Sequence, residues 1–345
     1  MPNKRVTMQD IANACGLSRN TVSKVFNGRG SVPAATQSLI LKTAKELGYG
    51  LPPEGKAVPS QGAQKTIALL TCNMPREYHF GTSVTSAFTD QISRSDYTLK
   101  LFEISPEELA QRKLPPHLAP EQIAGIVGIE MFDADYLDLL CGLKIPVILI
   151  DCPTQAAGRM MACDFIEMEN VTSVSLLVQG LLAAGAKKIG FVGDREHCSS
   201  FSERWEGYAI ALMGASLPIQ PEICILAKDD SPYNSVEWLT RQLDAMPFLP
   251  DAFVCANDYL AIHLMNALKK KGLSIPRDVM VTGFDGTSQS ELVDPALTTV
   301  QIPSTDIGRL CAEFLLARIR NPEIPYHWTH VKTTPVWRDS TRTRE

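Results

Sequence analysis

The chain has 345 residues, of which 45% are hydrophobic and 21% are charged. This length allows two or three domains, and the composition is that of a soluble globular protein rather than a disordered or fibrous one. No apolar run reaches the roughly 20 residues of a bilayer-spanning helix, and the N-terminus lacks the apolar region of a secretory signal, so we expect a cytoplasmic protein. Nine cysteines without a CxxC pair favour reduced thiols over a disulfide or zinc framework.

Charge is divided unevenly along the chain. Residues 1–50 contain seven Lys or Arg against two acidic residues, a net charge of +5, whereas the whole chain carries −5. This asymmetry favours an N-terminal module that meets a polyanion, although a basic face in contact with solvent alone would give the same pattern.

The first predicted helix follows Thr7, whose side chain can cap it together with Asp10 three residues later. Gly16 ends this helix. Its expected apolar stripe consists of Ile11, Ala12, Ala14 and Cys15.

A second and a third helix follow. Ser18 can cap the second helix, which the turn-prone Asn27-Gly28 ends, and Pro33 opens a third helix that runs to Gly48. Val22, Val25 and Phe26 of the second helix are expected to turn inward, and the apolar residues of the third helix are Leu39, Ile40, Ala44 and Leu47.

The first two helices are joined by a short turn that contains Gly, which is the pattern of a helix-turn-helix DNA-binding motif. With the apolar residues turned inward, Arg19, Asn20, Ser23 and Lys24 point outward from the N-terminal part of the second helix. In this motif that end of the helix enters the major groove.

The stretch VTMQDIANACGLSRNTVSKVFNG, followed by a third helix ending in KELGY, closely resembles the DNA-binding headpiece of the LacI/GalR (lactose-repressor) family. The resemblance implies that Arg19 and Asn20 read bases, because Arg matches the paired acceptors of guanine and Asn the donor and acceptor of adenine. Thr21 and Ser23 are expected at phosphates. The predicted DNA-binding residues are Thr7, Ser18, Arg19, Asn20, Thr21, Ser23, Lys24 and Asn27.

Residues 51–65 depart from this family. Relatives continue into a short hinge helix with an apolar wedge for the minor groove, whereas this chain has three prolines and three glycines between Tyr49 and Gly62. The wedge position falls at Val58, directly before Pro59, and this composition disfavours a helix. We expect a flexible tether that can order on DNA, and weaker coupling between hinge and effector than in relatives.

From residue 66 onward, strands and helices alternate. Strands are predicted at 66–72, 97–102, 124–130, 146–151, 188–193, 252–256 and 279–284, and helices at 172–185, 202–214, 234–245, 258–271 and 304–320. This alternation predicts parallel sheets with helices on both faces, and the length predicts two α/β lobes.

The resemblance extends through the core, where it rests on AND (256–258), RWEGY (204–208), the segment 283–303 and VWRDST (336–341). It implies an all-α helix-turn-helix headpiece followed by a two-lobed core like a periplasmic sugar-binding protein, with the effector between the lobes. The expected domains are the headpiece at 1–50, the linker at 51–65 and the core at 66–345, with lobe one at about 66–162 and 300–329 and lobe two at about 163–298 and 331–345.

Polar residues follow several predicted strands, at the edge where such folds bind ligands. By resemblance, Arg204, Asn257 and Asp285 contact the effector and Phe80 lines the cleft, since such side chains pair with sugar hydroxyls or cover an apolar sugar face. Asp151 and Tyr233 are weaker candidates. Alternatives remain open: Arg204 could pair with Glu203 or Asp194 on the surface, Asp285 could hold a turn, Asp258 could cap a helix, and Phe80 could be core.

Sequence motifs of catalysis such as GxxxxGK[ST], GxSxG and HExxH are missing from the chain. His327 and His330 are three residues apart, but no Cys or acid is placed in the sequence to complete a metal site, so we expect a β-segment there. We therefore predict no enzyme, no catalytic residue, no cofactor and no metal.

The resemblance implies a sequence-specific transcriptional regulator, most often a repressor, whose operator affinity is controlled by a small molecule, with a carbohydrate as the expected effector. Two headpieces are needed for tight binding, so we expect a homodimer on a pseudo-palindromic operator in the nucleoid. Two other classes stay open: a ligand-binding protein without DNA function, and an α/β enzyme with an added basic domain.

Overall fold

The computed structural model describes residues 6–26, 32–47, 65–72, 80–154, 159 and 161–341, without the side chains of Phe26, Ala34 and Phe80. The chain divides into two compact units, residues 1–63 and 64–345. Nearly all of the linker, together with Asn27 and Gly48, lies outside the described residues. The predictions made for these positions therefore stay predictions.

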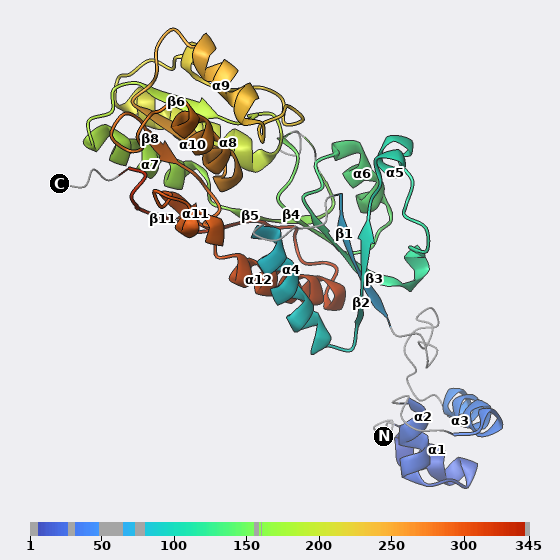
Figure 1. Ribbon diagram of the computed structural model, residues 1–345. Coiled ribbons are helices and arrows are strands. Elements are labelled where there is room, and N and C mark those ends of the chain that lie inside the picture. Colours follow the sequence, from blue (N-terminus) through green and yellow to red (C-terminus); the bar gives the residue numbers. More distant parts are fainter. Residues whose placement is uncertain are drawn as a thin grey trace. The chain divides into compact units, whose positions relative to one another are not determined.

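Three helices make up the described part of the first unit (Figure 1): α1 (Met8–Cys15), α2 (Arg19–Phe26) and α3 (Ala34–Glu46). Thr7 and Asp10 form the predicted capping box of α1, and Gly16 ends it with a left-handed φ of 66°. The Ser18 hydroxyl accepts a hydrogen bond from the backbone N–H of Thr21 at 3.1 Å and so caps α2. The helix-turn-helix prediction is confirmed.

Helices this short are marginal alone and depend on packing against one another. Their shared core is Ile11, Ala12, Val22, Ile40 and Ala44, all fully buried. Ala14 of the predicted apolar stripe is exposed, as are Leu39 and Leu47 of the third helix, because each helix of so small a bundle can cover only one face.

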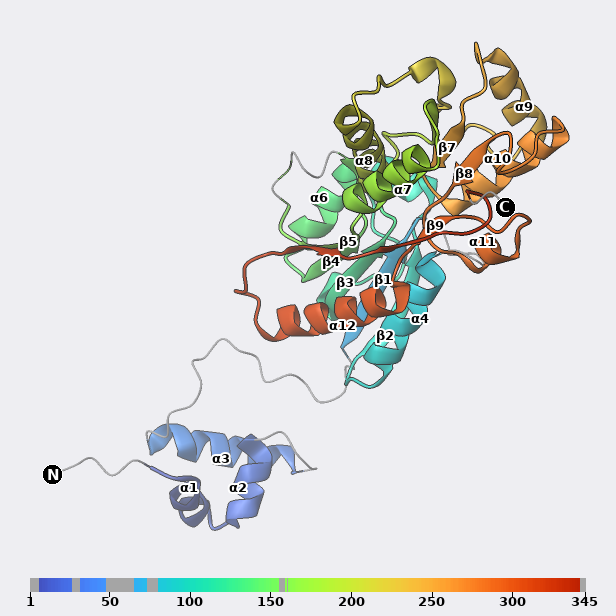
Figure 2. The same ribbon diagram turned by 90° about the vertical axis from the view of Figure 1, so that its left-hand side faces the viewer.

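The first lobe of the core is built on a six-stranded parallel sheet with the order β10-β5-β4-β3-β1-β2 (Figures 1 and 2). Its strands are β1 (Thr66–Thr71), β2 (Thr98–Glu103), β3 (Ile123–Ile129), β4 (Val147–Ile150), β5 (Asp164–Met168) and β10 (Trp328–Val331). Helices α4 (Phe80–Ser93) and α12 (Ser304–Arg320) lie side by side and cover one face. The opposite face is covered by α6 (Ala134–Gly142), and α5 (Pro106–Gln111) lies next to α6.

Burial on both faces explains the continuous apolar strands. Ile67 and Leu69 of β1 belong to the core under α4 and α12, whereas Ala68 and Leu70 belong to the separate core under α6. The 3₁₀ turn Pro120–Gln122 leads into β3.

The second lobe is built on the parallel strands β6 (Ile189–Val192), β7 (Ala252–Cys255) and β8 (Met280–Thr282). Its helices are α7 (Val171–Ala183), α8 (Ser199–Gly214), α9 (Val236–Ala245), α10 (Asp258–Lys270) and α11 (Ser288–Leu292), with a 3₁₀ turn at Pro221–Ile223. Helices α7 and α8 pack closely at Gly207, which has no side chain. Any larger residue at this position would collide with the Val171 carbonyl oxygen.

The chain passes between the lobes three times, after β5, after β9 (Thr299–Gln301) and between β10 and β11 (Thr334–Val336). Strands β9 and β11 pair antiparallel beside the second lobe. The predicted architecture, a helical headpiece with a two-lobed α/β core, is confirmed. In the described residues no helix is long and apolar enough to cross a membrane.

The boundary expected at about 163 is wrong, since β5 pairs with β4 in the first sheet and the chain leaves that lobe only after Met168. The sequence DFIEM hid this strand, because acidic residues are depleted in strands. Asp164 and Glu167 are nevertheless buried, with Asp164 paired to Arg318 and Glu167 bonded by Trp328.

Candidate functional site

A cavity of about 1270 Å³ lies between the two lobes of the core. It is bounded by the carboxyl ends of the strands, the edge at which parallel α/β sheets bind ligands. The first lobe contributes Glu103, Glu130, Phe132 and Asp151, and the second lobe contributes residues that include His197, Phe201, Arg204, Asp229, Asp230, Tyr233, Asn257 and Asp285.

Arg204 lies on α8 and is buried, at 3% exposure. Its Nε donates to Asn170 Oδ1 at 2.9 Å and its Nη1 to the Ala256 carbonyl oxygen at 2.6 Å. The guanidinium also stacks on Phe284, 3.7 Å from the ring centre. The alternative of a surface pair with Glu203 or Asp194 is therefore wrong, because the side chain points inward from α8.

Asp285 follows β8 and faces Arg204, with Nη1 3.5 Å from Oδ1. Its φ of 115° is strained for a residue with a side chain, and such strain is common at ligand sites. Burial raises the pKa of this carboxyl to about 8, although Arg204 opposes the shift. Among the described residues, Nη2 of Arg204 and Oδ2 of Asp285 have no hydrogen-bond partner, so both are available at the cavity.

Asp151 directly follows β4 in the first lobe and reaches the second lobe. Its Oδ1 accepts hydrogen bonds from the backbone N–H groups of Cys152 at 2.8 Å and Ser200, at the start of α8, at 3.4 Å. Burial and the nearby Glu167 raise its pKa to about 6. Asp151 thus joins a strand end of one lobe to a helix of the other.

Glu130 was not predicted as a site residue. It directly follows β3 just as Asp151 directly follows β4, and its φ is 54°. Its position as a carboxylate at the end of the strand predicted at 124–130 was the signal that could have identified it. Burial raises its pKa to about 8, and the neighbouring carboxylates Asp151, Asp285 and Asp229 add to the shift.

Asn257 lines the cavity but also caps α10, where its Oδ1 accepts from the Leu260 N–H at 2.9 Å. The alternative that Asp258 is the cap is wrong, because Asp258 is already inside the helix and accepts hydrogen bonds from Thr287 and Thr299.

Tyr233 is buried at the cavity wall and donates its hydroxyl to the Ala227 carbonyl oxygen at 2.8 Å. Helix α4 begins at Phe80, whose side chain lies outside the description, so its role stays a prediction.

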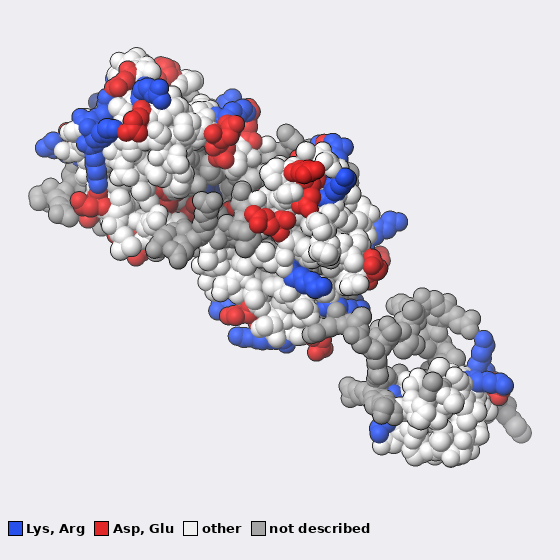
Figure 3. Space-filling model, turned by 45° about the vertical axis from the view of Figure 1, so that its right-hand side comes forward, with Lys and Arg blue, Asp and Glu red and all other residues white. Residues whose placement is uncertain are grey.

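The cavity is acidic and has an aromatic part. In the described lining, six carboxylates surround the single guanidinium of Arg204: Glu103, Glu130, Asp151, Asp229, Asp230 and Asp285. Figure 3 shows acidic side chains on both lobes beside the hollow between them. The His197 ring contacts Phe132 and Phe201, at centroid distances of 4.9 and 5.2 Å. Polar groups beside aromatic surface are typical of small-molecule sites.

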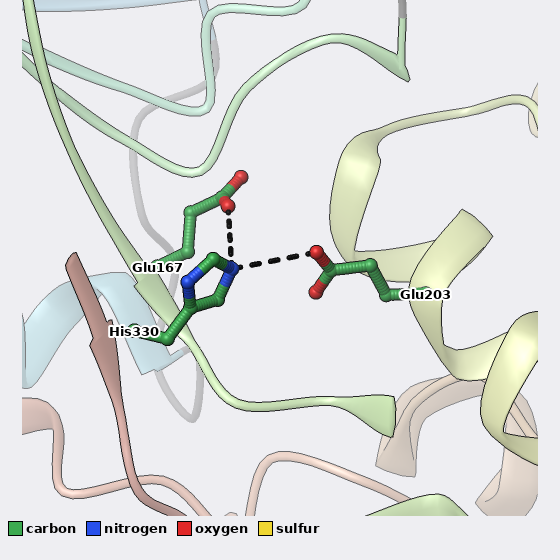
Figure 4. A group of neighbouring side chains, drawn as sticks. All are labelled: Glu167, Glu203 and His330. Carbon is green, nitrogen blue, oxygen red and sulfur yellow. Dashed lines mark ion pairs between the residues drawn. The ribbon is translucent and has the colours of Figure 1, made fainter. Parts of the chain in front are cut away.

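A second group of polar side chains lies outside the cavity, where Glu167, Glu203 and His330 converge (Figure 4). His330 lies on β10, which confirms the predicted β-segment. The prediction that no acid is placed near these histidines is wrong. Glu167 and Glu203 are distant in sequence, and only the pairing of β10 with β5 and the approach of α8 bring them to His330.

In the headpiece, α2 presents Arg19, Asn20 and Lys24 as exposed side chains, while Thr21 and Ser23 are half-buried. The hydroxyls of Ser18 and Thr21 lie 2.8 Å apart, and the Thr7 hydroxyl bonds Asp10. Arg19, Asn20 and Lys24 of α2 are therefore exposed and can reach a groove of DNA.

Comparisons with known proteins agree with this architecture. Residues 7–50 match the model of bacterial regulatory proteins of the lacI family, and residues 178–341 match a periplasmic binding protein-like domain. The chain therefore has a DNA-binding domain of the lacI family and a core domain of the periplasmic-binding-protein type. It is 27% identical over 319 residues to the transcriptional repressor PurR of Haemophilus influenzae strain PittEE, covering 92% of each.

Two further matches cover nearly the whole chain. The ribose operon repressor of Haemophilus influenzae strain Rd is 25% identical, with 97% of this chain and 98% of the relative covered. The solved complex of the regulator CelR with cellobiose has a TM-score of 0.70 at 23% identity, covering 97% of this chain and all of that one. The lac repressor dimer bound to operator and an anti-inducer also gives 0.70, at 22% identity, covering 99% and 100%.

These findings fix the kind of protein. The chain is a DNA-binding transcriptional regulator, with a helix-turn-helix headpiece of the lacI type and a ligand-binding core of the periplasmic-binding-protein type. Its relatives are transcriptional regulators.

Proposed function

We propose that the protein is a homodimeric repressor whose operator affinity is controlled by a neutral carbohydrate bound between the lobes. The supporting observation is the pair Arg204 and Asp285, buried in the cavity wall with Nη2 and Oδ2 left without a described protein partner. A donor and an acceptor side by side match two adjacent hydroxyls, each of which both donates and accepts.

The charge of the cavity supports a neutral effector. Among the described residues, the lining has six carboxyl groups and one guanidinium, and its exposed carboxylates Glu103, Asp229 and Asp230 would repel a sugar phosphate or a uronate, since like charges oppose binding. Burial raises the pKa of Glu130 and Asp285 to about 8, so these two act at neutral pH as polar groups rather than as negative charges. The rings of Phe132, Phe201 and His197 can cover the apolar face of a sugar. The ribose operon repressor and the CelR–cellobiose complex among the similar proteins support the same class.

Both lobes supply groups to the cavity, so closure brings Glu130 and Asp151 toward Arg204 and Asp285 when a ligand bridges them. A ligand changes DNA affinity only through a difference in its affinity for the open and closed forms. In a dimer, closure would change the spacing of the two headpieces and with it the fit to the two operator half-sites.

For DNA binding, we assign base contacts to Arg19 and Asn20, with Lys24 beside them, and phosphate contacts to Thr21 and Ser23; Thr7, Ser18 and Asn27 complete the proposed DNA-binding set. Exposed apolar side chains that a second copy could cover include Leu101 on the edge strand β2 and Leu176, Ile210 and Met213 on α7 and α8.

A protein with this function binds DNA in the cytoplasm. We propose that it has no catalytic function and needs no cofactor.

The effector is tested by thermal shift with ribose, cellobiose, other neutral sugars, sugar phosphates, uronates and nucleobases. A ligand that binds only the folded state raises the melting temperature, and we expect this from neutral sugars alone. Asp285→Ala should abolish the shift and the effector response while operator binding persists. A shift from sugar phosphates, or a full response in Asp285→Ala, would contradict the proposal.

The DNA contact is tested by mobility-shift titration against the upstream region of the protein's own gene. Arg19→Ala should cost about 1–3 kcal/mol in operator binding and relax the preference at one base pair. Lys42→Ala, an exposed charge-matched change on α3, serves as the control. If Arg19→Ala weakens all sequences alike, Arg19 contacts phosphate and not a base.

A further inference from the structure

Three side chains that the effector cavity does not use converge where the chain crosses between the lobes. Glu167 of β5 and His330 of β10 are register partners on adjacent parallel strands, and Glu203 approaches from α8 of the second lobe. The imidazole Nε2 lies 3.3 Å from Oε2 of Glu167 and 3.4 Å from Oε1 of Glu203. Figure 4 shows both carboxylates directed at this one nitrogen.

The two distances fit a shared cation better than direct hydrogen bonds. Charge-assisted N–H···O⁻ bonds are about 2.7–2.9 Å long, shorter than either contact. A zinc ion bound at about 2.0–2.1 Å by nitrogen and oxygen ligands in a tetrahedron sets these ligands about 3.3–3.4 Å apart. One ligand atom from each of the three residues lies within 4.8 Å of the others.

We propose that Glu167, Glu203 and His330 form a binding site for a divalent transition-metal ion of the zinc type. One imidazole nitrogen and two carboxylate oxygens are ligands that such ions accept. Three protein ligands leave the fourth tetrahedral position for water. The side chain of His330 is 41% exposed and that of Glu203 is 22% exposed, so an ion can enter from solvent, whereas Glu167 is buried at the base.

Neighbouring groups hold the two carboxylates in position, as outer-shell partners do in metal sites. Glu167 accepts hydrogen bonds from Trp328 Nε1 and, at 3.0 Å, from Cys152 Sγ. Glu203 accepts from Asn170 Nδ2 at 2.8 Å, and Asn170 Oδ1 in turn accepts from Arg204 Nε at 2.9 Å. The site is therefore two hydrogen bonds away from the guanidinium at the cavity.

Such an ion would tie α8 of the second lobe to two strands of the first sheet. It would also fix Glu203 and, through Asn170, the orientation of Arg204, so metal binding should change effector affinity. This consequence depends on the proposed function of the cavity, whereas metal binding itself does not.

The test uses the full chain after treatment with EDTA, titrated with Co²⁺ and then with Zn²⁺ at pH 8, where the metal has to displace a proton from the imidazole and binding therefore releases protons. Visible absorption of tetrahedral Co²⁺ reports the site, and mass spectrometry counts the metal. We expect one ion per chain, without the near-ultraviolet charge-transfer band of cysteine ligation. His330→Gln and Glu203→Gln should each weaken binding by about tenfold or more.

His327→Gln is the matched control, because His327 lies near β10 but pairs with Asp164 at 3.6 Å instead of the cluster. It should bind metal like the wild-type chain. The proposal is overturned if His330→Gln and Glu203→Gln bind as tightly as His327→Gln, or if the bound Co²⁺ shows thiolate charge transfer. It is also overturned if the wild-type chain takes up no metal while His330→Gln alters the effector response, since the cluster would then be an ion pair alone.

Discussion

Two buried Arg–Asp pairs lie in the part of the core that the structure describes, and they differ in how completely their hydrogen-bonding groups are used. Arg318 of α12 and Asp164 of β5 bond through two parallel contacts of 2.9 and 2.7 Å. Arg204 of α8 and Asp285 meet through one contact of 3.5 Å. The four side chains are similarly buried, with exposures of 3–10%.

Beyond their partner carboxylates the two arginines also differ. Arg318 donates to the carbonyl oxygens of Pro322, Ile324 and Pro325, so its guanidinium is fully used within the protein. Arg204 donates to Asn170 and Ala256 and leaves Nη2 for the cavity. A fully bonded pair holds the chain together, whereas a pair that leaves buried groups unused is suited to a ligand.

The largest expected effect follows from removing the satisfied pair. Arg318→Ala leaves Asp164 buried without its counter-charge and should lower the free energy of unfolding by about 3–5 kcal/mol. Urea denaturation of the variant measures this loss. Arg320→Ala, an exposed change on the same helix, should have little effect. Equal stability of the Arg318→Ala and Arg320→Ala variants would contradict the conclusion that the Arg318–Asp164 pair stabilises the fold.

A smaller effect on stability but a selective effect on binding is expected from Asp285→Asn. Because burial already raises the pKa of this carboxyl to about 8, replacing it with a neutral group of the same shape should change the unfolding free energy by less than about 1 kcal/mol. Effector binding, measured by calorimetry, should weaken by about tenfold or more, roughly 1.4 kcal/mol. Asp164→Asn should show the reverse, with low stability and little direct effect on effector contacts.

The smallest expected effect concerns pH. The pKa of Glu130 is raised from its ordinary value of 4.5 to about 8 in the folded chain, so the folded state binds more protons than the unfolded state between these two values. This contribution to stability is complete below the lower value and is lost as pH rises through about 8. Glu130→Gln should therefore flatten the decline of melting temperature between about pH 5 and 8, whereas the exposed Glu121→Gln should leave the decline unchanged.

Much of the fold was predictable because its signals are local. The capping box of Thr7 and Asp10 and the apolar spacing of Ile11 and Val22 predicted the headpiece helices. Apolar runs such as residues 146–151 predicted strand β4, because a parallel strand is buried on both faces. Likewise, Asp151 and Asp285 were found because they lie at the end of, or directly after, predicted strands.

Other features depended on contacts between distant segments. The acidic strand β5 is buried because Arg318, more than 150 positions away, neutralises Asp164. Glu203 meets His330 because the chain crosses between the lobes three times, and Arg204 turns inward because of where α8 packs. Sequence spacing reports which side chains share a face of one helix or strand, but the meeting of charges from three elements is set by how those elements pack together.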